Sequence, residues 1–182
     1  MARPSDPNLT EQILAAARDM LASQGGKVQM RALAAKVGTT TPTIYTRFKT
    51  KEHLLAALKN DASRRLKETM SKETTFRDAC RAYLSFAENN PYEYGLLFGS
   101  RSQRRTTESD LEALLAQLGN RIARDSGLAP DLARERAFQV WLVLHGASTT
   151  RLADKKASAW WPRVQVACID ACEALIAPRG RK

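Results

Sequence analysis

Residues 26–51 read GKVQMRALAAKVGTTTPTIYTRFKTK, and this stretch decides the fold. Its first half carries four apolar residues at the spacing i, i+3, i+4 and i+7, which places them on one face of a helix. They are Met30, Leu33, Ala34 and Val37. Gly38 follows, and glycine is the residue that most readily adopts positive φ at a helix C-terminus. The pattern predicts a helix of about two turns that ends in a glycine turn.

A second short helix is predicted to begin three residues later. Thr41 is expected to be its N-cap, with Pro42 at the first helical position, where no N–H partner is needed. Three residues are predicted to share its apolar face: Ile44, Tyr45 and Phe48. Its other faces would carry Thr41, Thr43, Thr46 and Arg47, beside Lys49 and Lys51. Two short helices, a glycine turn and a basic outer face indicate a helix-turn-helix, whose second helix enters the major groove of DNA.

The run LAAKVGTTTPTIYTRFKTKEHLLAAL, residues 33–58, closely resembles the DNA-binding domain of TetR-family transcriptional regulators. Thr39 departs from the pattern, because the family usually has an apolar residue there that seals the turn. The resemblance implies base-edge contacts from Thr41, Thr43 and Arg47 and backbone contacts from Tyr45, Lys49 and Lys51. The Tyr45 ring could equally pack under the helix. The complete set of expected DNA contacts is Lys27, Arg31, Thr40, Thr41, Thr43, Tyr45, Thr46, Arg47, Lys49 and Lys51.

The charge distribution favours the same partner. The net charge of the 182-residue chain is +10, and residues 1–51 contain eight basic and three acidic residues, so half of the excess lies in under a third of the chain. Such a balance favours a polyanionic partner. A surface that is merely kept soluble by its charge is the alternative, and the helix-turn-helix motif argues against it.

Beyond the motif, every predicted element is again a helix. Apolar periodicity and Gly, Pro and Asn punctuation predict helices at about 8–24, from 51 to about 70, 76–89, 90–99, 111–127, from 129, and 158–177. We therefore expect an all-α fold of about nine helices. Residues 1–50 would form a three-helix DNA-binding head, and residues 51–182 a helical effector-binding and dimerisation domain. Ser100 to Thr107 reads as an exposed loop with three arginines.

The last two predicted helices are apolar on more than one side. In the last one, one face carries Trp161, Val164, Cys168, Ala171 and Leu175, and another carries Val166, Ile169 and Ile176. A second subunit is the natural cover for such helices. The motifs NPYEYGLLFG at 90–99 and Trp141, His145 and Gly146 also resemble the WHG type of TetR-family effector domain. That resemblance implies a pocket among the fifth to eighth helices for a small apolar or aromatic ligand, and a homodimer through the eighth and ninth. Candidate ligand contacts are Tyr83, Phe86, Tyr94, Phe98, Phe138, Trp141 and His145. Aromatic residues at this spacing could instead be core, and His145 a hydrogen-bonded packing residue.

Other function classes find little support. No apolar run approaches the ~20 residues that span a bilayer, and the N-terminus lacks a signal peptide's apolar core, so we expect a cytoplasmic protein with no membrane partner. Cys80, Cys168 and Cys172 are expected to be buried free thiols. No metal-ligand spacing, catalytic set or phosphate-binding loop is present, so we expect no cofactor, no metal and no enzymatic activity.

The sequence thus predicts a sequence-specific transcriptional regulator that binds double-stranded operator DNA as a dimer. Repression of a palindromic operator, relieved by a small ligand, is the favoured form. A DNA-binding dimer that no ligand regulates is the alternative.

Overall fold

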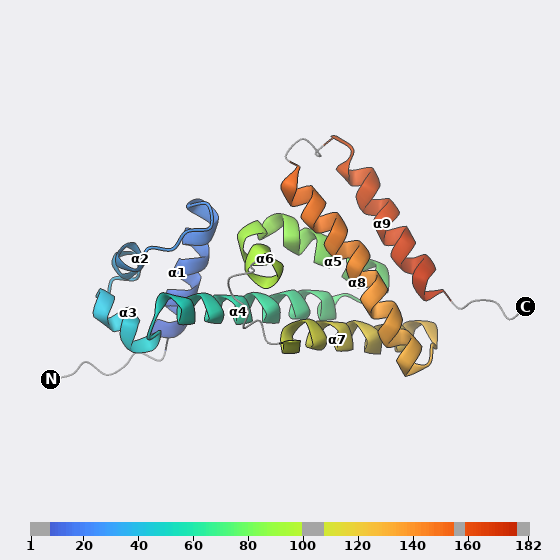
Figure 1. Ribbon diagram of the computed structural model, residues 1–182, viewed down its shortest axis with the longest axis horizontal. Helices are drawn as coiled ribbons and strands as arrows, with labels where there is room; N and C mark the ends of the chain where they lie inside the picture. The colour runs from blue at the N-terminus through green and yellow to red at the C-terminus, as the bar shows by residue number, and fades with distance from the viewer. Residues whose placement is uncertain (1–7, 100–107, 155–158, 178–182) are drawn as a thin grey trace, which may run out of the picture. The chain divides into compact units, whose positions relative to one another are not determined.

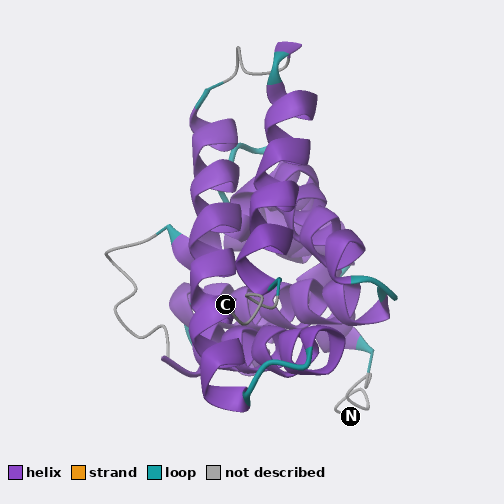
Figure 2. Cartoon of the chain, turned by 90° about the vertical axis from the view of Figure 1, so that its right-hand side faces the viewer, coloured by secondary structure: helices purple, strands orange, loops and turns teal. Residues whose placement is uncertain are grey.

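The computed structural model describes residues 8–99, 108–154 and 159–177 (Figure 1). In this part of the chain there are nine helices and no strand, which confirms the predicted all-α fold. Figure 2 shows the described elements as helices joined by loops. The helices are α1 Leu9–Ser23, α2 Met30–Val37, α3 Thr41–Arg47, α4 Lys51–Lys72, α5 Phe76–Asn89, α6 Pro91–Phe98, α7 Glu108–Ser126, α8 Pro130–Ala153 and α9 Trp161–Ile176. The predicted helix start at Ser158, the loop Ser100 to Thr107 and the charged C-terminal residues lie outside the described residues.

Two compact units make up the chain. The first contains the described residues up to Ala62 together with α6, and the second contains residues 63–89 and the described residues from 108 onward. Helix α4 therefore begins in the first unit and ends in the second. The functional boundary near residue 50 stays a prediction.

The first unit is built on the apolar faces of α1 to α4. Its buried core includes Ile13, Ala17, Met20, Leu21, Val28, Leu33, Ile44, Leu54 and Leu58. The turn after α1 is closed by the Gly26 N–H, which donates to Leu21 O at 2.8 Å while Gly26 holds φ at +83°. A Cβ on Gly26 would lie 2.9 Å from Cδ1 of Tyr92, on α6. The backbone angle therefore favours glycine here, and any larger residue would also require the Tyr92 ring to move.

The second unit packs α5, α7, α8 and α9 with the C-terminal half of α4. Its buried apolar residues include Leu66, Met70, Cys80, Tyr83, Leu84, Leu114, Leu118, Ile122, Val140, Leu144 and Ile169. Polar contacts join the same helices: Arg77 on α5 reaches Glu173 and Asp170 on α9 at 2.5 and 2.7 Å. The Arg151 guanidinium on α8 lies 3.0 Å from the Glu88 carboxylate on α5.

Helix α9 buries a different stripe from the one that the sequence pattern singled out. Trp161, Ile169, Cys172 and Ile176 are buried, whereas Val164, Cys168, Ala171 and Leu175, which were predicted to share the face of Trp161, are half-buried or exposed. The second apolar face predicted for the last two helices is thus only partly covered within one chain. Of the three thiols, Cys80 and Cys172 are buried and Cys168 is half-buried.

No helix within the described ranges combines the length and the apolar character needed to cross a bilayer.

Candidate nucleic-acid interface

The turn between α2 and α3 is a Schellman motif. Gly38 adopts the left-handed conformation at φ 70° and ψ 32°. Its N–H donates to Ala35 O at 3.2 Å, and the Thr39 N–H donates to Ala34 O at 2.9 Å, so two terminal carbonyls of α2 are satisfied. The Thr39 contribution is a backbone bond that does not depend on its side chain, and this explains how the turn closes without the apolar residue usual in the family.

Thr40, and not Thr41, caps α3. Thr40 is extended, at φ −105° and ψ 154°, and its Oγ1 accepts a hydrogen bond from the Thr43 N–H at 3.4 Å. The prediction for Thr41 was therefore wrong by one residue. Thr41 is the first helical residue and Pro42 the second, a position that proline tolerates because the first-turn N–H groups have no intrahelical partner.

Helix α3 turns two apolar side chains inward and leaves Tyr45 outside. Ile44 is fully buried and Phe48 is 7% exposed, whereas Tyr45 is 42% exposed. Successive helical residues are about 100° apart, so Tyr45 lies well round the helix from Ile44 while Phe48 lies close to it. The expectation that Tyr45 shares the buried face was wrong, and the exposed side chain leaves its hydroxyl accessible to a phosphate.

The outward side chains of α3 are hydroxyls and one guanidinium. Thr46 Oγ1 donates to Pro42 O at 3.0 Å, and the hydroxyls of Thr40 and Thr43 lie 2.9 Å apart, so these groups are already oriented by the helix itself. Arg47 is exposed at the C-terminal end of the helix. This surface offers hydroxyl oxygens as acceptors and a guanidinium as a donor, the chemistry that reads base edges and binds phosphates.

Exposed cations flank the helix. None of Lys27, Arg31, Lys49 and Lys51 forms an ion pair with a carboxylate in the part of the chain that the structure describes. Other basic residues of the unit are paired: Arg18 with Asp61 at 2.6 Å and Lys36 with Asp19 at 3.3 Å. All four of these unpaired cations belong to the predicted set of DNA contacts, and Lys49 and Lys51 are the two predicted to meet the DNA backbone.

The start of α4 fixes the position of two of these lysines. Thr50 Oγ1 accepts a hydrogen bond from the His53 N–H at 3.3 Å, so Thr50 is the N-cap of α4. A hydrogen bond from its own backbone N–H, with a second from the Thr50 hydroxyl, lowers the pKa of Glu52 below its ordinary value. Lys49 and Lys51 thus stand on either side of a capped helix start.

The predicted ligand contacts do not gather around one described cavity. Tyr94 and Phe98 belong to the first unit, where their ring centroids lie 4.9 Å apart. Tyr83 and Phe86 are buried in the second unit, and the Arg65 guanidinium lies 5.6 Å from the Phe86 ring centroid. These four remain candidate contacts whose role is a prediction.

The remaining three predicted contacts form a ladder along α8. The Phe138 and Trp141 rings are stacked with centroids 5.9 Å apart, and the Trp141 and His145 rings with centroids 4.8 Å apart. Phe138 is 46% exposed, so this row of stacked rings extends to the protein surface. Burial lowers the pKa of His145 and favours its neutral form in the stack.

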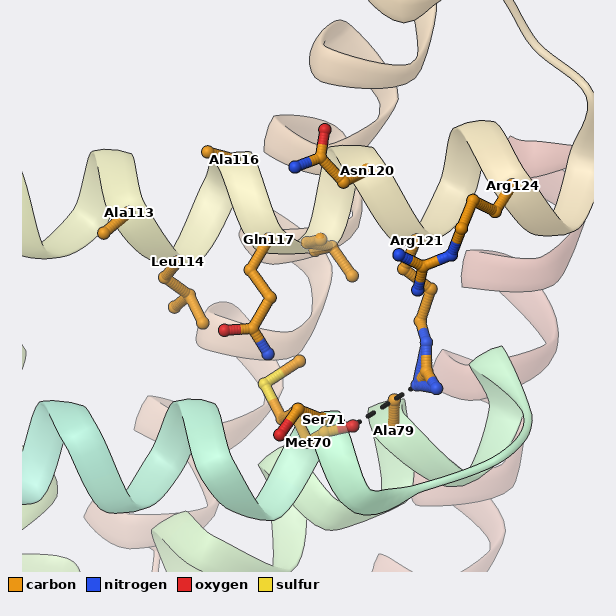
Figure 3. Close-up of a pocket in the computed structure, with 11 residues that line it drawn as sticks. Met70, Ser71, Ala79, Ala113, Leu114, Ala116, Gln117, Asn120, Arg121 and Arg124 are labelled. Carbon is orange, nitrogen blue, oxygen red and sulfur yellow. Dashed lines mark hydrogen bonds between the residues drawn. The ribbon is translucent and has the colours of Figure 1, made fainter.

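Two described grooves flank α7, and sequence reasoning missed both. One, of about 500 Å³, is lined by Met70, Ser71, Ala79, Ala113, Leu114, Ala116, Gln117, Leu118, Asn120, Arg121 and Arg124 (Figure 3). The other, of about 880 Å³, is lined by residues of α7 and the start of α8. Neither contains any of the seven predicted ligand contacts. Among the described residues, no group of three or more His, Cys, Asp or Glu is placed to hold a metal ion.

Comparison with known proteins agrees with this geometry over both units. A family model described as bacterial regulatory proteins, tetR family, matches residues 13–58, and one described as tetracyclin repressor-like, C-terminal domain, matches residues 76–163. No curated protein matched the sequence.

Solved structures show the same fold. A TetR-family transcriptional regulator from Streptomyces coelicolor aligns with a TM-score of 0.78 at 15% identity, over 94% of this chain and 81% of its own. A TetR-like transcriptional regulator from Rhodococcus sp. RHA1 aligns with a TM-score of 0.64 at 19% identity, over 96% of both chains. A TetR variant from Acinetobacter baumannii AYE in complex with minocycline aligns with a TM-score of 0.64 at 18% identity, over 91% of this chain and 93% of its own.

At these identities the structural likeness shows the fold, and the two family models add the assignment of each part of the sequence. With the capped helix-turn-helix already described, they lead to one conclusion: the chain belongs to the TetR family and is a DNA-binding transcriptional regulator rather than an enzyme.

Proposed function

We propose that the protein is a homodimeric repressor that binds a palindromic operator and is released from it by a small apolar or aromatic ligand. The observation that carries the DNA-binding part of this proposal is α3 itself. It is capped by Thr40, anchored by buried Ile44, and presents Thr43, Thr46 and Arg47 outward beside cations that no described carboxylate neutralises. The site of action would be the bacterial cytoplasm, where the operator DNA lies.

Dimerisation through α8 and α9 is the second part of the proposal. Three large apolar side chains on these helices are at least 46% exposed: Phe138, Leu142 and Val166. A second copy of the chain would cover them and place two recognition helices on successive turns of the duplex, ~34 to 36 Å apart or a near multiple.

Release by a ligand is the third part. A ligand bound among α5 to α8 would displace α4, which begins directly after the helix-turn-helix, and change the separation of the two heads. A coupling free energy of ~1 to 3 kcal/mol would lower operator affinity by about 5- to 150-fold. The structural relative from Acinetobacter baumannii was solved with minocycline, which makes that compound a reasonable first probe.

A dimer that no ligand regulates is the second candidate. Tyr83 and Phe86 are buried, and neither described groove is lined by a predicted ligand contact, which favours a packed body over a preformed aromatic pocket. Operator affinity measured with a panel of small aromatic compounds, minocycline included, separates the two. A compound that weakens binding by 5-fold or more supports ligand release, and a panel without effect favours the unregulated dimer.

Selection of bound sequences from random duplexes by the purified protein tests the proposal for DNA. We expect an enriched inverted repeat whose half-sites are one helical turn, or a multiple, apart. Enrichment of no sequence, or of a single unrepeated half-site, would contradict it.

Two variants then separate base-specific recognition from nonspecific electrostatic binding to DNA. Arg47→Ala should cost ~1 to 3 kcal/mol on the selected operator and relax the preference at one position of each half-site. Lys49→Ala should weaken binding to all DNA sequences alike. It should also make the slope of log affinity against log salt concentration shallower by about one unit per head. Lys72→Ala, in the last turn of α4, makes the same charge change and serves as the control with neither effect.

A further inference from the structure

The groove shown in Figure 3 lies wholly within the second unit and has an apolar floor. It is formed by the last turn of α4, the start of α5 and one side of α7, and its volume of about 500 Å³ is within the ~300 to 1,000 Å³ typical of small-molecule sites. Met70, Ala79, Leu114 and Leu118 form the floor, and each is less than 5% exposed. A ligand seated here would meet methyl, methylene and thioether groups on its underside.

The rim of the groove is polar and cationic. Gln117, Asn120, Arg121 and Arg124 follow one another at i, i+3, i+4 and i+7 on α7 and so share one side of the helix. The eleven lining residues include two arginines and no carboxylate. Because Asp125 lies beside Arg121, Arg124 is the lining charge that favours a negative group in the groove.

The two arginines have different roles. Arg121 is committed to the protein, because its guanidinium donates to Met70 O at 3.3 Å and to Glu73 O and lies 3.9 Å from the Asp125 carboxylate. Arg124 is exposed and forms no ion pair within the described residues. Figure 3 shows both arginines at one end of the groove and Ala113 at the other. Arg124 is thus the guanidinium that a ligand can engage.

We propose that this groove binds an amphipathic anion, such as a medium-chain carboxylate. The apolar chain would lie along Met70 and Leu114, and the carboxylate would accept charge-assisted hydrogen bonds from Arg124 at the arginine end. A fully polar anion gains nothing from the floor, and an amphipathic cation is repelled by the rim. This proposal concerns a site separate from the aromatic residues discussed above and does not depend on DNA binding.

Calorimetric titration of the full chain with sodium decanoate tests it, with decyltrimethylammonium and decanol as probes of the same chain length. We expect saturable binding of one decanoate per chain, weaker binding in 0.5 M salt, and preference for decanoate over both other probes. Arg124→Gln should weaken the binding of decanoate about 5- to 20-fold and leave the binding of decanol unchanged. A loss of this size is expected for a partly solvated charge-assisted hydrogen bond. Arg163→Gln, at an exposed position of α9, is the charge-matched control and should bind like the original chain.

A second variant tests the apolar part of the groove. Ala113→Trp places an indole at an exposed lining position and should weaken decanoate and decanol alike, with an unchanged melting curve. Absence of saturable decanoate binding, equal binding of the cation, or undiminished binding by Arg124→Gln would each overturn the proposal. Because no DNA is present, failure here leaves the operator proposal standing, and failure to select an operator leaves this one standing.

Discussion

The contact between Gly26 and Tyr92 allows a substitution whose cost can be worked out from geometry. Gly26→Ala puts a side chain at φ +83°, which costs ~1 to 3 kcal/mol of backbone strain, and places a Cβ 2.9 Å from Tyr92 Cδ1. The Tyr92 ring is 40% exposed and can turn away, at about 0.5 to 1.5 kcal/mol for an off-rotamer χ angle. Alanine also lowers the conformational entropy of the unfolded chain, which offsets ~0.4 to 1 kcal/mol of this cost. The net loss of stability should be about 2 kcal/mol.

Gly38→Ala provides the matched comparison, because Gly38 also has positive φ, at +70°, but a Cβ there would have no neighbour within 4 Å. It should carry the backbone strain alone and cost about 1 kcal/mol less than Gly26→Ala. Adding Tyr92→Ala to Gly26→Ala should recover the ring contribution and give a coupling free energy of about 0.5 to 1.5 kcal/mol in a double-mutant cycle.

Hydrogen exchange of α1 amides is the suitable assay. All three tryptophans of the chain, Trp141, Trp160 and Trp161, lie in the second unit, so tryptophan fluorescence would report on the wrong part. Gly26→Ala should speed exchange in residues 9–23 through faster local opening. The reasoning is refuted if Gly26→Ala costs no more than Gly38→Ala, or if removing the Tyr92 ring recovers nothing.

Three further predictions follow from single contacts. Thr40→Ala should lose ~0.5 to 1 kcal/mol of capping and weaken binding to every duplex, whereas Thr40→Ser should keep both, as measured by urea unfolding and DNA titration. Phe138→Glu should shift the chain toward monomer in sedimentation, and an unchanged dimer would exclude this face. Hydrogen bonding from Thr75 lowers the pKa of Asp78 below its ordinary value, so the stabilisation is present above the pKa of the unfolded chain and is lost as the pH falls through the folded-state pKa. Thr75→Val should flatten the acid limb of thermal stability, and an unchanged limb would contradict this.

The helix-turn-helix could be predicted because its signals are local. Four apolar residues at helical spacing and Gly38 fix the first helix and its end, and both appear in the structure as expected. The cap of α3 could not be placed to one residue, because Thr39, Thr40 and Thr41 offer three consecutive hydroxyls and all satisfy the sequence preference. Only the backbone shows which one is extended.

Tyr45 was misplaced for a related reason. An amphipathic ring counts as apolar in a periodicity argument, although its position, about 100° from Ile44, lies at the edge of the buried arc. Whether Tyr45 is exposed depends on how much of the α3 surface the other helices of the head cover. A local sequence pattern carries no information about that coverage.

The groove beside α7 shows what sequence reasoning misses more generally. Gln117, Asn120 and Arg124 look in sequence like any solvated helix face. Their setting is created by Met70 and Ala79, which come from helices about 40 residues earlier in the chain. A site assembled from separate helices has no characteristic residue spacing in the sequence. A site on one helix has such a spacing and can be detected from it.

The energetics of α3 explain why pairing of heads is a physical requirement for a specific reader. Arg47 is the only side chain of α3 able to make a bidentate base contact, worth ~1 to 3 kcal/mol. One hydroxyl proton is used between Thr40 and Thr43, and the Thr46 hydroxyl donates to Pro42 O, which places threonine contacts at the lower end of that range. One head therefore supplies about 3 to 5 kcal/mol of discrimination, near the bottom of the ~4 to 10 kcal/mol that separates specific from non-specific binding. Two heads on one duplex double that figure, while the unpaired lysines raise affinity for all sequences equally. In the proposed homodimer, specificity would thus depend on the second copy. Any event that changed the spacing of the two heads would then remove specific binding before it removed the electrostatic attraction to DNA.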